Sequence, residues 1–356
     1  MTADYRLALL TDAHVFGGAE QFLRTLVVGL PHRVHITVIG TDHRIVSQVV
    51  NRAEGVASMV IRRGCLSAWR ALRQVRPDVV QVNLSQVNGS RALIVAAILL
   101  RLPIVAVDHG PAPGLTWRGR MLQRVFSSRI AARVSVSDQS ARDVEKYAGL
   151  PRNLVQTIRN GVPRVEPCPP APPGNELTVG MLARLDPVKG IDLTIRAIAQ
   201  LANVRLEVGG TGPARDELVD LVNELGVGDR VTFLGHVRDP MDVLCGFDVV
   251  ALPSRSEGLP LVLLEAMHAH RPVIVSNVGA MAEVVEDHVC GLVVEPDSVE
   301  SLAHAIAEYR DDPNLRRSCA DNALTLARDQ MSAERMVDEY DELFSSLATA
   351  RSGARS

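Results

Sequence analysis

Short aliphatic runs alternate with amphipathic segments from the start of the chain. Near-continuous runs of Val, Ile and Leu are typical of strands buried on both faces of a parallel sheet. In the first half we expect strands at 6–11, 34–40, 78–84 and 103–109. Helices are expected between them at 17–30, 65–75 and 90–100. This order predicts an α/β domain whose parallel sheet is covered by helices.

A proline-rich stretch at 164–176 interrupts the alternation. Proline lacks a backbone N–H and fixes φ, so the stretch fits neither a helix nor a central strand and is expected to be a linker. The alternation then restarts, with strands expected at 176–182, 204–210, 230–235, 247–253 and 272–277. Helices are expected at 190–201, 214–226, 258–270 and 298–310, with one more at 332–348.

The pattern therefore predicts two α/β domains of similar size with a cleft between them. We place the first at 1–163, the linker at 164–176 and the second at 177–330. The helix within 331–356 lies outside the second alternation, and we expect it to cross back to the first domain. Ligands of open parallel sheets bind beyond the carboxyl ends of the strands, so the loops that follow strands are the candidates for chemistry.

Composition narrows the class of protein. Hydrophobic residues make up 47% and charged residues 22%, which is typical of a globular chain. Aromatic residues make up only 3%, too few for base-stacking platforms, so no nucleic acid is expected as a partner. The longest apolar run, 92–100, is too short to span a bilayer, and no signal peptide is recognisable. Five dispersed cysteines without a CxxC pair fit a reducing cytoplasm and no zinc site.

Charge is distributed unevenly along the chain. Residues 1–163 carry 21 Lys and Arg against 10 Asp and Glu, a balance of 21 − 10 = +11. The remaining residues carry 17 and 31, a balance of 17 − 31 = −14. The stretch 118–133 holds five arginines and no acid, which suggests an anionic partner: a phosphorylated or lipid-linked acceptor, a membrane surface, or the acidic second domain. An ordinary solvated helical face explains the same pattern equally well.

Two loops carry groups suited to a diphosphate. GGAE at 17–20 follows the first strand, and its glycines let free N–H groups at a helix start approach an anion. The same residues are also explained as a simple tight turn. ARLDPVKG at 183–190 follows the first strand of the second domain and brings Arg184 close to Lys189. Lys189 is one of only two lysines against 36 arginines, which favours a function over a merely solvated loop.

A dinucleotide-binding motif is disfavoured. GGTGPA at 209–214 is the nearest match, but Arg215 stands where a third glycine is needed. No Walker A sequence occurs either. An oxidoreductase or a P-loop enzyme is therefore not expected.

Carboxylates and a histidine complete the candidates. SRSEGLPLVLLEAM at 254–267 places Glu257 at the end of a strand and Glu265 on the expected helix, which we start at Gly258. Glu257 is also explained as an acid favourable at a helix N-terminus. Glu265 stands among aliphatic residues, where a carboxylate needs hydrogen-bond donors. His109 ends a strand and would face the cleft, although a histidine in such a place is often only structural.

These motifs together resemble the retaining glycosyltransferases of family 4, which have the GT-B fold of two Rossmann-like domains. The resemblance rests on Glu257–x7–Glu265, ARLDPVKG, GGAE, His109-Gly110 and NGV at 160–162, and it is strongest from 177 to 296. It implies that Arg184 and Lys189 bind the donor diphosphate. Gly17 and Gly18 would donate backbone N–H groups to it.

The resemblance also implies roles toward the rest of the donor. Glu257 would hold the donor sugar together with the amides of Gly258, Leu259, Pro260 and Leu261, and His109 would reach a sugar hydroxyl. Glu265 would hold the ribose hydroxyls, and the backbone near His236 would read the base. UDP-sugars are the commonest donors in the family. The acceptor stays open between a lipid-linked saccharide, a polysaccharide precursor and a small natural product.

Two positions depart from the family's pattern: Pro163 follows NGV in place of the common Asp, and Asn83 stands where a histidine is frequent. The chemistry implied is a front-face retaining transfer, in which Glu257 orients the sugar and no metal or cofactor takes part. Two alternatives remain: a sugar-nucleotide epimerase or hydrolase of the same fold, and a non-catalytic sugar-nucleotide-binding subunit. The cytoplasm, with peripheral contact at the inner membrane face through 118–133, is the expected location.

Overall fold

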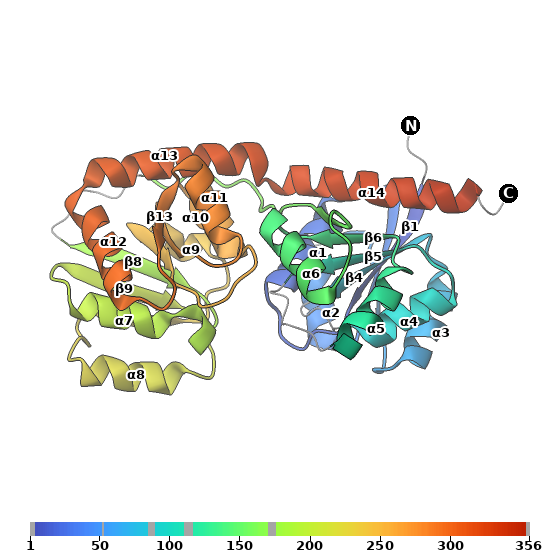
Figure 1. Ribbon diagram of the computed structural model, residues 1–356, viewed down its shortest axis with the longest axis horizontal. Helices are drawn as coiled ribbons and strands as arrows, with labels where there is room; N and C mark the ends of the chain where they lie inside the picture. The colour runs from blue at the N-terminus through green and yellow to red at the C-terminus, as the bar shows by residue number, and fades with distance from the viewer. Residues whose placement is uncertain (1–3, 52, 85–89, 110–116, 170–175, 354–356) are drawn as a thin grey trace. The chain divides into compact units, whose positions relative to one another are not determined.

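The computed structural model describes residues 4–51, 53–84, 90–109, 117–169 and 176–353. The chain forms two compact units (Figure 1). Unit 1 comprises Met1–Pro163 and Ala333–Ser356, and unit 2 comprises Arg164–Ser332. The C-terminal helix therefore belongs to unit 1, and the described part of the proline-rich stretch belongs to unit 2.

Unit 1 is built on a parallel sheet of seven strands in the order β3-β2-β1-β4-β5-β6-β7. The strands are β1 (Tyr5–Thr11), β2 (Val34–Gly40), β3 (Ala57–Val60), β4 (Val79–Leu84), β5 (Ile104–Asp108), β6 (Ala132–Ser135) and β7 (Val155–Thr157). Its helices are α1 (Gly18–Gly29), α2 (His43–Val49), α3 (Cys65–Val75), α4 (Arg91–Leu99), α5 (Trp117–Ser127), α6 (Asp138–Ala148) and α14 (Ala333–Gly353). The strand order reverses between β1 and β4, so the loops after these strands flank one switch point.

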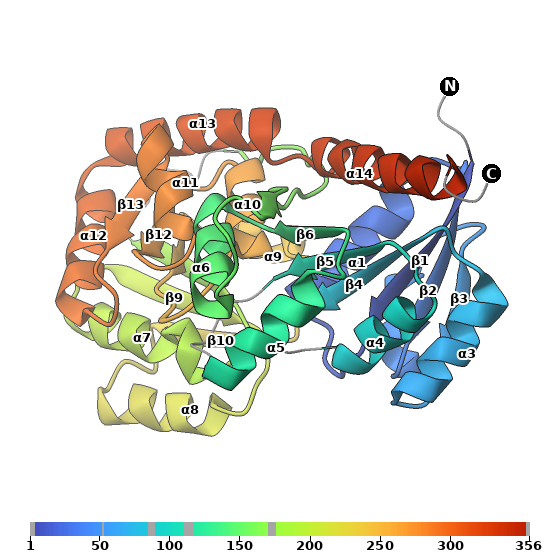
Figure 2. The same cartoon turned by 45° about the vertical axis from the view of Figure 1, so that its right-hand side comes forward.

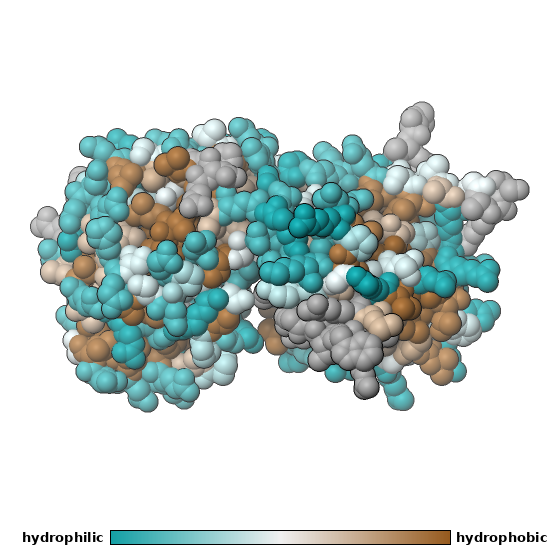
Figure 3. Space-filling view, viewed as in Figure 1, coloured by the Kyte–Doolittle hydropathy of each residue, from teal (hydrophilic) through white to brown (hydrophobic). Residues whose placement is uncertain are grey.

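Helices cover both faces of this sheet because successive strand residues point to opposite sides. Leu7 and Leu9 of β1 belong to the core that contains α1, α2 and α14, whereas Ala8 and Leu10 belong to the core that contains α3 and α4. Tyr340 and Phe344 of α14 are fully buried, so the C-terminal helix is part of the hydrophobic core of unit 1. On the face seen in Figure 3, hydrophobic atoms gather over α3 and α4, which carry the exposed side chains of Leu66 and Leu99.

Unit 2 is built on a parallel sheet of six strands in the order β10-β9-β8-β11-β12-β13. Figure 2 labels four of them, β9, β10, β12 and β13. The strands are β8 (Leu177–Leu182), β9 (Val204–Gly209), β10 (Val231–Gly235), β11 (Val249–Leu252), β12 (Val273–Ser276) and β13 (Gly291–Val294). Its helices are the 3-10 turn η1 (Pro187–Lys189), α7 (Ile191–Ala199), α8 (Arg215–Glu224), α9 (Met241–Leu244), α10 (Leu261–His268), α11 (Met281–His288), α12 (Val299–Asp311) and α13 (Pro313–Gln330). Here too the order reverses, between β8 and β11.

The expected fold class is confirmed: both units have the parallel, helix-covered sheet of a Rossmann-like domain. One boundary was wrong. The helix expected from Gly258 begins at Leu261, because Pro260 occupies its N-cap and residues 253–260 follow an irregular path. The structure also contains elements that were not expected: the strands β3, β6, β7 and β13 and the helices α2, α5, α6, α9, α11 and α13.

A disulfide ties the proline-rich stretch to unit 2. Cys168 is bonded to Cys245, and its N–H donates to the carbonyl of Ala269 at 3.2 Å. The guanidinium of Arg271 donates to the carbonyls of Pro169 and Cys245, both at 3.0 Å. The expectation of dispersed, reduced cysteines was therefore wrong for this pair; a separation of 77 residues gave no sequence signal for it.

The chain passes from one unit to the other twice, after Pro163 and after Ser332, and hydrogen bonds anchor these two passages next to each other. Ala333 donates its N–H to the carbonyl of Val162 at 2.9 Å, and Arg335 donates to the carbonyl of Arg159 at 2.8 Å. On the side of unit 2, Arg164 donates to the carbonyl of Arg328 at 3.4 Å. The start and the end of unit 2 are thus held side by side by backbone acceptors.

Candidate functional site

The loop after β8 is held in place by a tight turn. Asp186 caps η1 by accepting the N–H of Val188 at 3.2 Å, and it is ion-paired with the exposed Arg184. Gly190 follows with φ +67°, and a Cβ there would lie 2.1 Å from the carbonyl oxygen of Pro253. Only glycine allows this approach, which sets the loop against the segment that follows β11.

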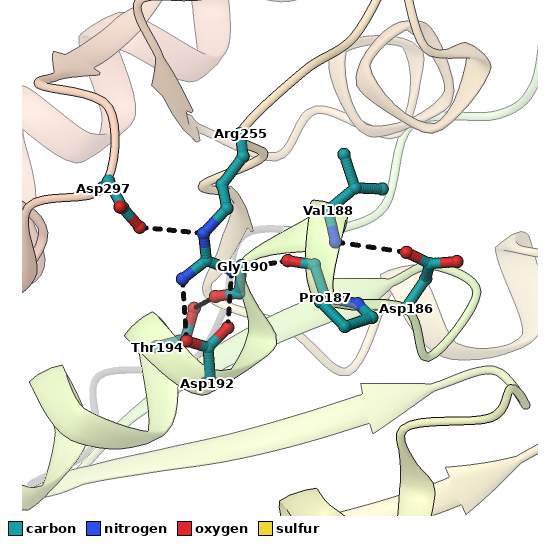
Figure 4. A network of polar contacts seen from close by, with 8 residues as sticks. All are labelled: Asp186, Pro187, Val188, Gly190, Asp192, Thr194, Arg255 and Asp297. Atoms are coloured by element: carbon teal, nitrogen blue, oxygen red, sulfur yellow. Dashed lines mark hydrogen bonds and ion pairs between the residues drawn. The ribbon is translucent and has the colours of Figure 1, made fainter.

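Arg255 fastens this loop to its neighbours, as Figure 4 shows. Its guanidinium donates to both carboxylate oxygens of Asp192 at 2.8 Å and to Asp297 at 2.8 Å. Its N–H donates to the carbonyl of Val188 at 2.7 Å, and its side chain also reaches the carbonyl of Pro187. The bonds with Asp192 and, after it, Asp297 raise the pKa of Arg255 above its ordinary value. Sequence reasoning missed this residue.

Lys189, in the loop that Arg255 fastens, forms an ion pair with Glu257. Both side chains are half-buried, and the buried Ser254 hydroxyl also donates to Glu257 at 3.3 Å. The cation expected on a diphosphate and the carboxylate expected on a sugar are therefore in contact with each other. An anion approaching Lys189 competes with Glu257, which couples the two roles.

The segment from Glu257 to Leu261 lies against the loop after β12. Gly279 has φ +56°, and a Cβ there would lie 2.1 Å from the carbonyl oxygen of Glu257. Ala280 donates its N–H to the carbonyl of Gly258 at 3.1 Å. Of the four residues whose backbone amides were assigned to the donor sugar, Pro260 has no N–H, so that part of the assignment was wrong. Gly258 and Leu259 are buried.

Glu265 lies on α10 and is half-buried. Burial, with a smaller contribution from the negative charge of Asp239, raises the pKa of Glu265 from 4.5 to about 7. His236 follows β10 and is exposed. Because the helix begins only at Leu261, Glu265 is helical and Glu257 lies in the irregular segment before the helix.

The glycines of GGTGPA have a structural role that sequence reasoning missed. Gly210 has φ +139°, and a Cβ there would lie 1.8 Å from the carbonyl oxygen of Ala183. At Gly212 a Cβ would lie 2.3 Å from the carbonyl oxygen of Leu185. Leu185 in turn donates its N–H to the carbonyl of Thr211 at 3.0 Å. The stretch thus packs backbone against backbone on the loop that carries Arg184 and Lys189.

In unit 1, GGAE forms the start of α1. The buried carboxylate of Glu20 accepts the N–H of Gly17 at 3.2 Å and the hydroxyl of Thr11 at 3.4 Å. Burial raises the pKa of Glu20 despite these bonds. One of the two amides assigned to the diphosphate, that of Gly17, is therefore already engaged. Nothing lies within 4 Å of a Cβ placed on Gly18, so no neighbouring group requires glycine there.

His109 lies at the carboxyl end of β5 and is half-buried. Its Nε2 is 3.2 Å from Oδ1 of Asn83, and its ring meets the edge of Phe22 with centroids 4.7 Å apart. Burial lowers the pKa of His109 to about 3, so the imidazole is neutral near pH 7. It cannot serve as a cation or as a strong base there, which leaves hydrogen bonding as its means of action.

The basic stretch 118–133 is less uniform than its sequence suggests. Arg133 is buried, and its Nε and Nη2 donate to the two carboxylate oxygens of buried Asp108 at 2.7 and 3.0 Å. Arg133 is therefore unavailable to an outside anion, and its assignment to the basic surface was wrong. Arg124 and Arg129 are exposed. The side chains of Arg118 and Arg120 lie outside the described residues.

The described residues contain neither a cluster of metal ligands nor a helix that could cross a membrane. No group of three or more His, Cys, Asp or Glu side chains in that part of the chain is arranged to hold a metal ion. Within the same residues, no helix has both the length and the apolar character needed to cross a bilayer.

Two family profiles match adjoining parts of the chain. "Glycosyltransferase Family 4" matches residues 16–165, and "Glycosyl transferases group 1" matches residues 168–325. Among solved structures, Anabaena Alr3699/HepE in complex with UDP has a TM-score of 0.81 at 22% identity, over 96% of this chain and all of that one. Sucrose-phosphate synthase of Thermosynechococcus elongatus has a TM-score of 0.81 at 19% identity, over 97% and 100%. Two Rossmann-like units of this kind define the GT-B class.

Curated relatives agree. The lipopolysaccharide core biosynthesis glycosyltransferase LpsD of Rhizobium meliloti is 28% identical over 281 residues, 77% of each chain. The alpha-D-kanosaminyltransferase of Streptomyces kanamyceticus is 33% identical over 170 residues, which are 46% of this chain and 44% of that protein. The D-inositol 3-phosphate glycosyltransferase of Mycolicibacterium smegmatis is 34% identical over 199 residues, 51% and 46%. The chain thus spans less than half the length of the last two relatives. It belongs to the family-4 glycosyltransferases.

Proposed function

We propose that the protein is a retaining glycosyltransferase that moves a sugar, a hexose in the first instance, from a nucleotide-diphosphate donor to a hydroxyl acceptor. The observation that carries this proposal is the Lys189–Glu257 ion pair at the loop that Arg255 fastens. A cation there balances the charge that develops on a departing diphosphate, and the carboxylate beside it faces the positive charge that develops on the sugar. UDP is the proposed nucleotide, supported by the relative solved with UDP and with UDP-glucose.

In the proposed mechanism Arg184, Lys189 and the backbone amide of Gly18 bind the diphosphate. Glu265 accepts hydrogen bonds from the ribose, and the backbone near His236 contacts the base. The leaving phosphate takes the proton of the acceptor hydroxyl on the face where the new bond forms. Glu257 orients the sugar and need not attack it. The side-chain cations supply the charge stabilisation, so the reaction is proposed to need no metal or cofactor.

The donor is tested by thermal shift over a panel of UDP-, GDP- and ADP-sugars, followed by a nucleotide-release assay with saccharide, lipid-linked and small natural-product acceptors. With the best donor, Lys189→Met and Glu257→Gln are expected to lower turnover by about 10²–10³-fold, the usual effect of removing one preorganised electrostatic group. Arg205→Met serves as the control, since it breaks the exposed Arg205–Glu176 ion pair in the same unit. Full turnover by Glu257→Gln at saturating donor contradicts the assigned role.

Two results in the same screen point to the alternatives. Free sugar or an epimer formed without any acceptor indicates a hydrolase or an epimerase. Tight binding of a sugar nucleotide without turnover over the whole acceptor panel indicates a binding subunit.

The proposed acceptor belongs to glycan, glycolipid or natural-product biosynthesis, and the named relatives LpsD and kanosaminyltransferase support that range. We infer peripheral contact with an anionic membrane through α5, at the cytoplasmic face. Met121 and Val125 on this helix are exposed, as are Arg124 and Arg129. Flotation with phosphatidylglycerol vesicles tests this contact. Arg124→Ser/Arg129→Ser is expected to lose binding while keeping nucleotide affinity, and no flotation of the parent protein ends the idea.

A further inference from the structure

The polar chain at the carboxyl ends of β4 and β5 has a fixed direction. Nδ2 of Asn83 donates to the carbonyl of Ala19 at 2.8 Å, and a carbonyl accepts only. The amide of Asn83 therefore cannot be turned over without placing two acceptors against each other. Its Oδ1 is left to face Gln81, whose Nε2 donates to it at 2.8 Å, and Nε2 of His109 at 3.2 Å.

This direction decides which nitrogen of His109 carries the proton. Oδ1 of Asn83 has no hydrogen, so the contact at 3.2 Å is a hydrogen bond only if Nε2 of His109 donates. Burial keeps the imidazole neutral, so it carries one proton, and that proton is on Nε2. Nδ1 then offers a lone pair. Among the described residues, no hydrogen bond to Nδ1 is formed.

We propose that Asn83 is a positioning residue that locks His109 in the Nε2–H tautomer, so that Nδ1 accepts a hydrogen bond from a hydroxyl of the sugar substrate. This inference rests on the proposed function and adds a chemical restriction to it. The substrate group at this point has to be a hydrogen-bond donor. A carboxylate, a phosphate oxygen or a carbonyl oxygen is repelled there.

Gln81 shows that the network is built for direction. Its side chain is fully buried in β4, and its Oε1 has no hydrogen-bond partner among the residues that the structure describes. An unsatisfied buried acceptor lowers the stability of the folded protein, and a leucine at this place would avoid that loss. In return, the side-chain amide of Gln81 donates a hydrogen bond to Oδ1 of Asn83 and so holds that oxygen toward His109.

The tautomer is measured directly by two-bond ¹H–¹⁵N correlation spectra of the histidine-labelled protein near neutral pH, without any ligand. The chain has ten histidines, and the signals missing from His109→Gln identify the ring in question. A protonated Nε2 with a bare Nδ1 is expected. A proton on Nδ1, or on both nitrogens, overturns the proposal.

The functional part is tested with Asn83→Asp. A carboxylate at Nε2 stabilises the imidazolium, raises the pKa of His109 and so adds a proton at Nδ1. The affinity for UDP-glucose is then expected to fall roughly ten- to hundred-fold at neutral pH. It recovers as the pH rises through the new pKa, because loss of the proton restores the lone pair on Nδ1. Affinity for UDP alone stays unchanged, since UDP lacks the glucosyl group that contacts His109.

Other ionisable groups on the surrounding elements are Glu20 on α1, the Asp108–Arg133 pair on β5 and β6, and Tyr340 on α14. They are shared by the parent and the variant, so a pH limb found only in Asn83→Asp belongs to His109. Ser90→Ala is the control for local packing, because Ser90 donates to the backbone carbonyl of Asn83 at 3.1 Å and leaves its amide untouched. This control is expected to keep the tautomer.

The outcomes separate the two claims. An Asn83→Asp protein whose ratio of UDP-glucose to UDP affinity matches the parent at every pH overturns the positioning role. A parent that binds no sugar nucleotide and transfers no sugar overturns the proposed function, whereas the spectra still decide the tautomer.

Discussion

The buried pair of Asp108 and Arg133 yields a stability prediction that can be worked from its geometry. Both side chains are 2% exposed, and two hydrogen bonds of 2.7 and 3.0 Å join them, with a third from Arg133 to Ser127 at 3.1 Å. Arg133→Met removes the guanidinium at similar volume and leaves the carboxylate of Asp108 buried without its partner. Breaking one side of a buried ion pair costs about 3–5 kcal/mol. With a urea dependence of about 2 kcal/mol per M, the unfolding midpoint of unit 1 falls by roughly 2 M.

The chain offers its own probe for this measurement. Both tryptophans, Trp69 and Trp117, belong to the stretch Met1–Pro163, so tryptophan fluorescence during a urea titration reports on unit 1 alone. Asp108→Asn in the Arg133→Met background removes the stranded charge and is expected to recover most of the loss. Arg129→Met is the matched control, since this exposed arginine lies in the same basic stretch and should change stability by less than about 0.5 kcal/mol. A midpoint shift for Arg133→Met no larger than that of the control refutes the reasoning.

Three further results are expected. Cys168→Ser/Cys245→Ser is expected to lower the unfolding free energy of unit 2 by about 4 kcal/mol, the loop-entropy value for a closed loop of 77 residues. Equal unfolding temperatures for the variant and the oxidised parent in calorimetry contradict this. Gly190→Ala is expected to lower the unfolding free energy by at least about 2 kcal/mol and to weaken UDP binding, because φ is +67° and a backbone oxygen lies 2.1 Å from the new Cβ. Gly55→Ala is the control, since Gly55 has φ +73° but no atom close to a Cβ, so this variant shows the effect of backbone strain without the clash. The pKa of Glu265, raised from 4.5 to about 7, makes unit 2 less stable as pH rises through that window, since the folded state holds the proton longer. Glu265→Gln is expected to remove this dependence of the unfolding free energy on pH, and calorimetry that finds the same dependence in the variant excludes the shift.

Much of the fold followed from the sequence because its signal is local. The aliphatic strands of both units are buried on both faces, so the runs of Val, Ile and Leu mark them directly. The start of α10 was misplaced because 253–260 takes its path from partners elsewhere. Gly279 backs Glu257, and Arg255 joins η1, α7 and the loop before α12, contacts that periodicity does not contain.

The site shows the same limit. Lys189 and Glu257 were expected near a donor from their motifs, but their direct ion pair joins loops 68 residues apart. Arg255 looked like any solvated loop arginine, and Arg133 looked like one of five surface cations. What distinguishes them is a carboxylate supplied by another strand or helix: Asp192 for Arg255 and Asp108 for Arg133. A count of charges along the chain does not reveal such a partner. In the same way, the spacing of the cysteines does not reveal the bond between Cys168 and Cys245.

The contribution of α14 to the core of unit 1 has a consequence for synthesis on the ribosome. Tyr340, Phe344 and their neighbours on α14 complete a core whose remaining residues are made before position 163, so the growing chain has to produce all of Arg164–Ser332 before unit 1 is whole. Unit 2 is contiguous and has every one of its strands as soon as it emerges. The half of the protein translated first is therefore the half that finishes folding last. Until α14 arrives, an apolar face over β1 and β4 stays open to chaperones and to proteases.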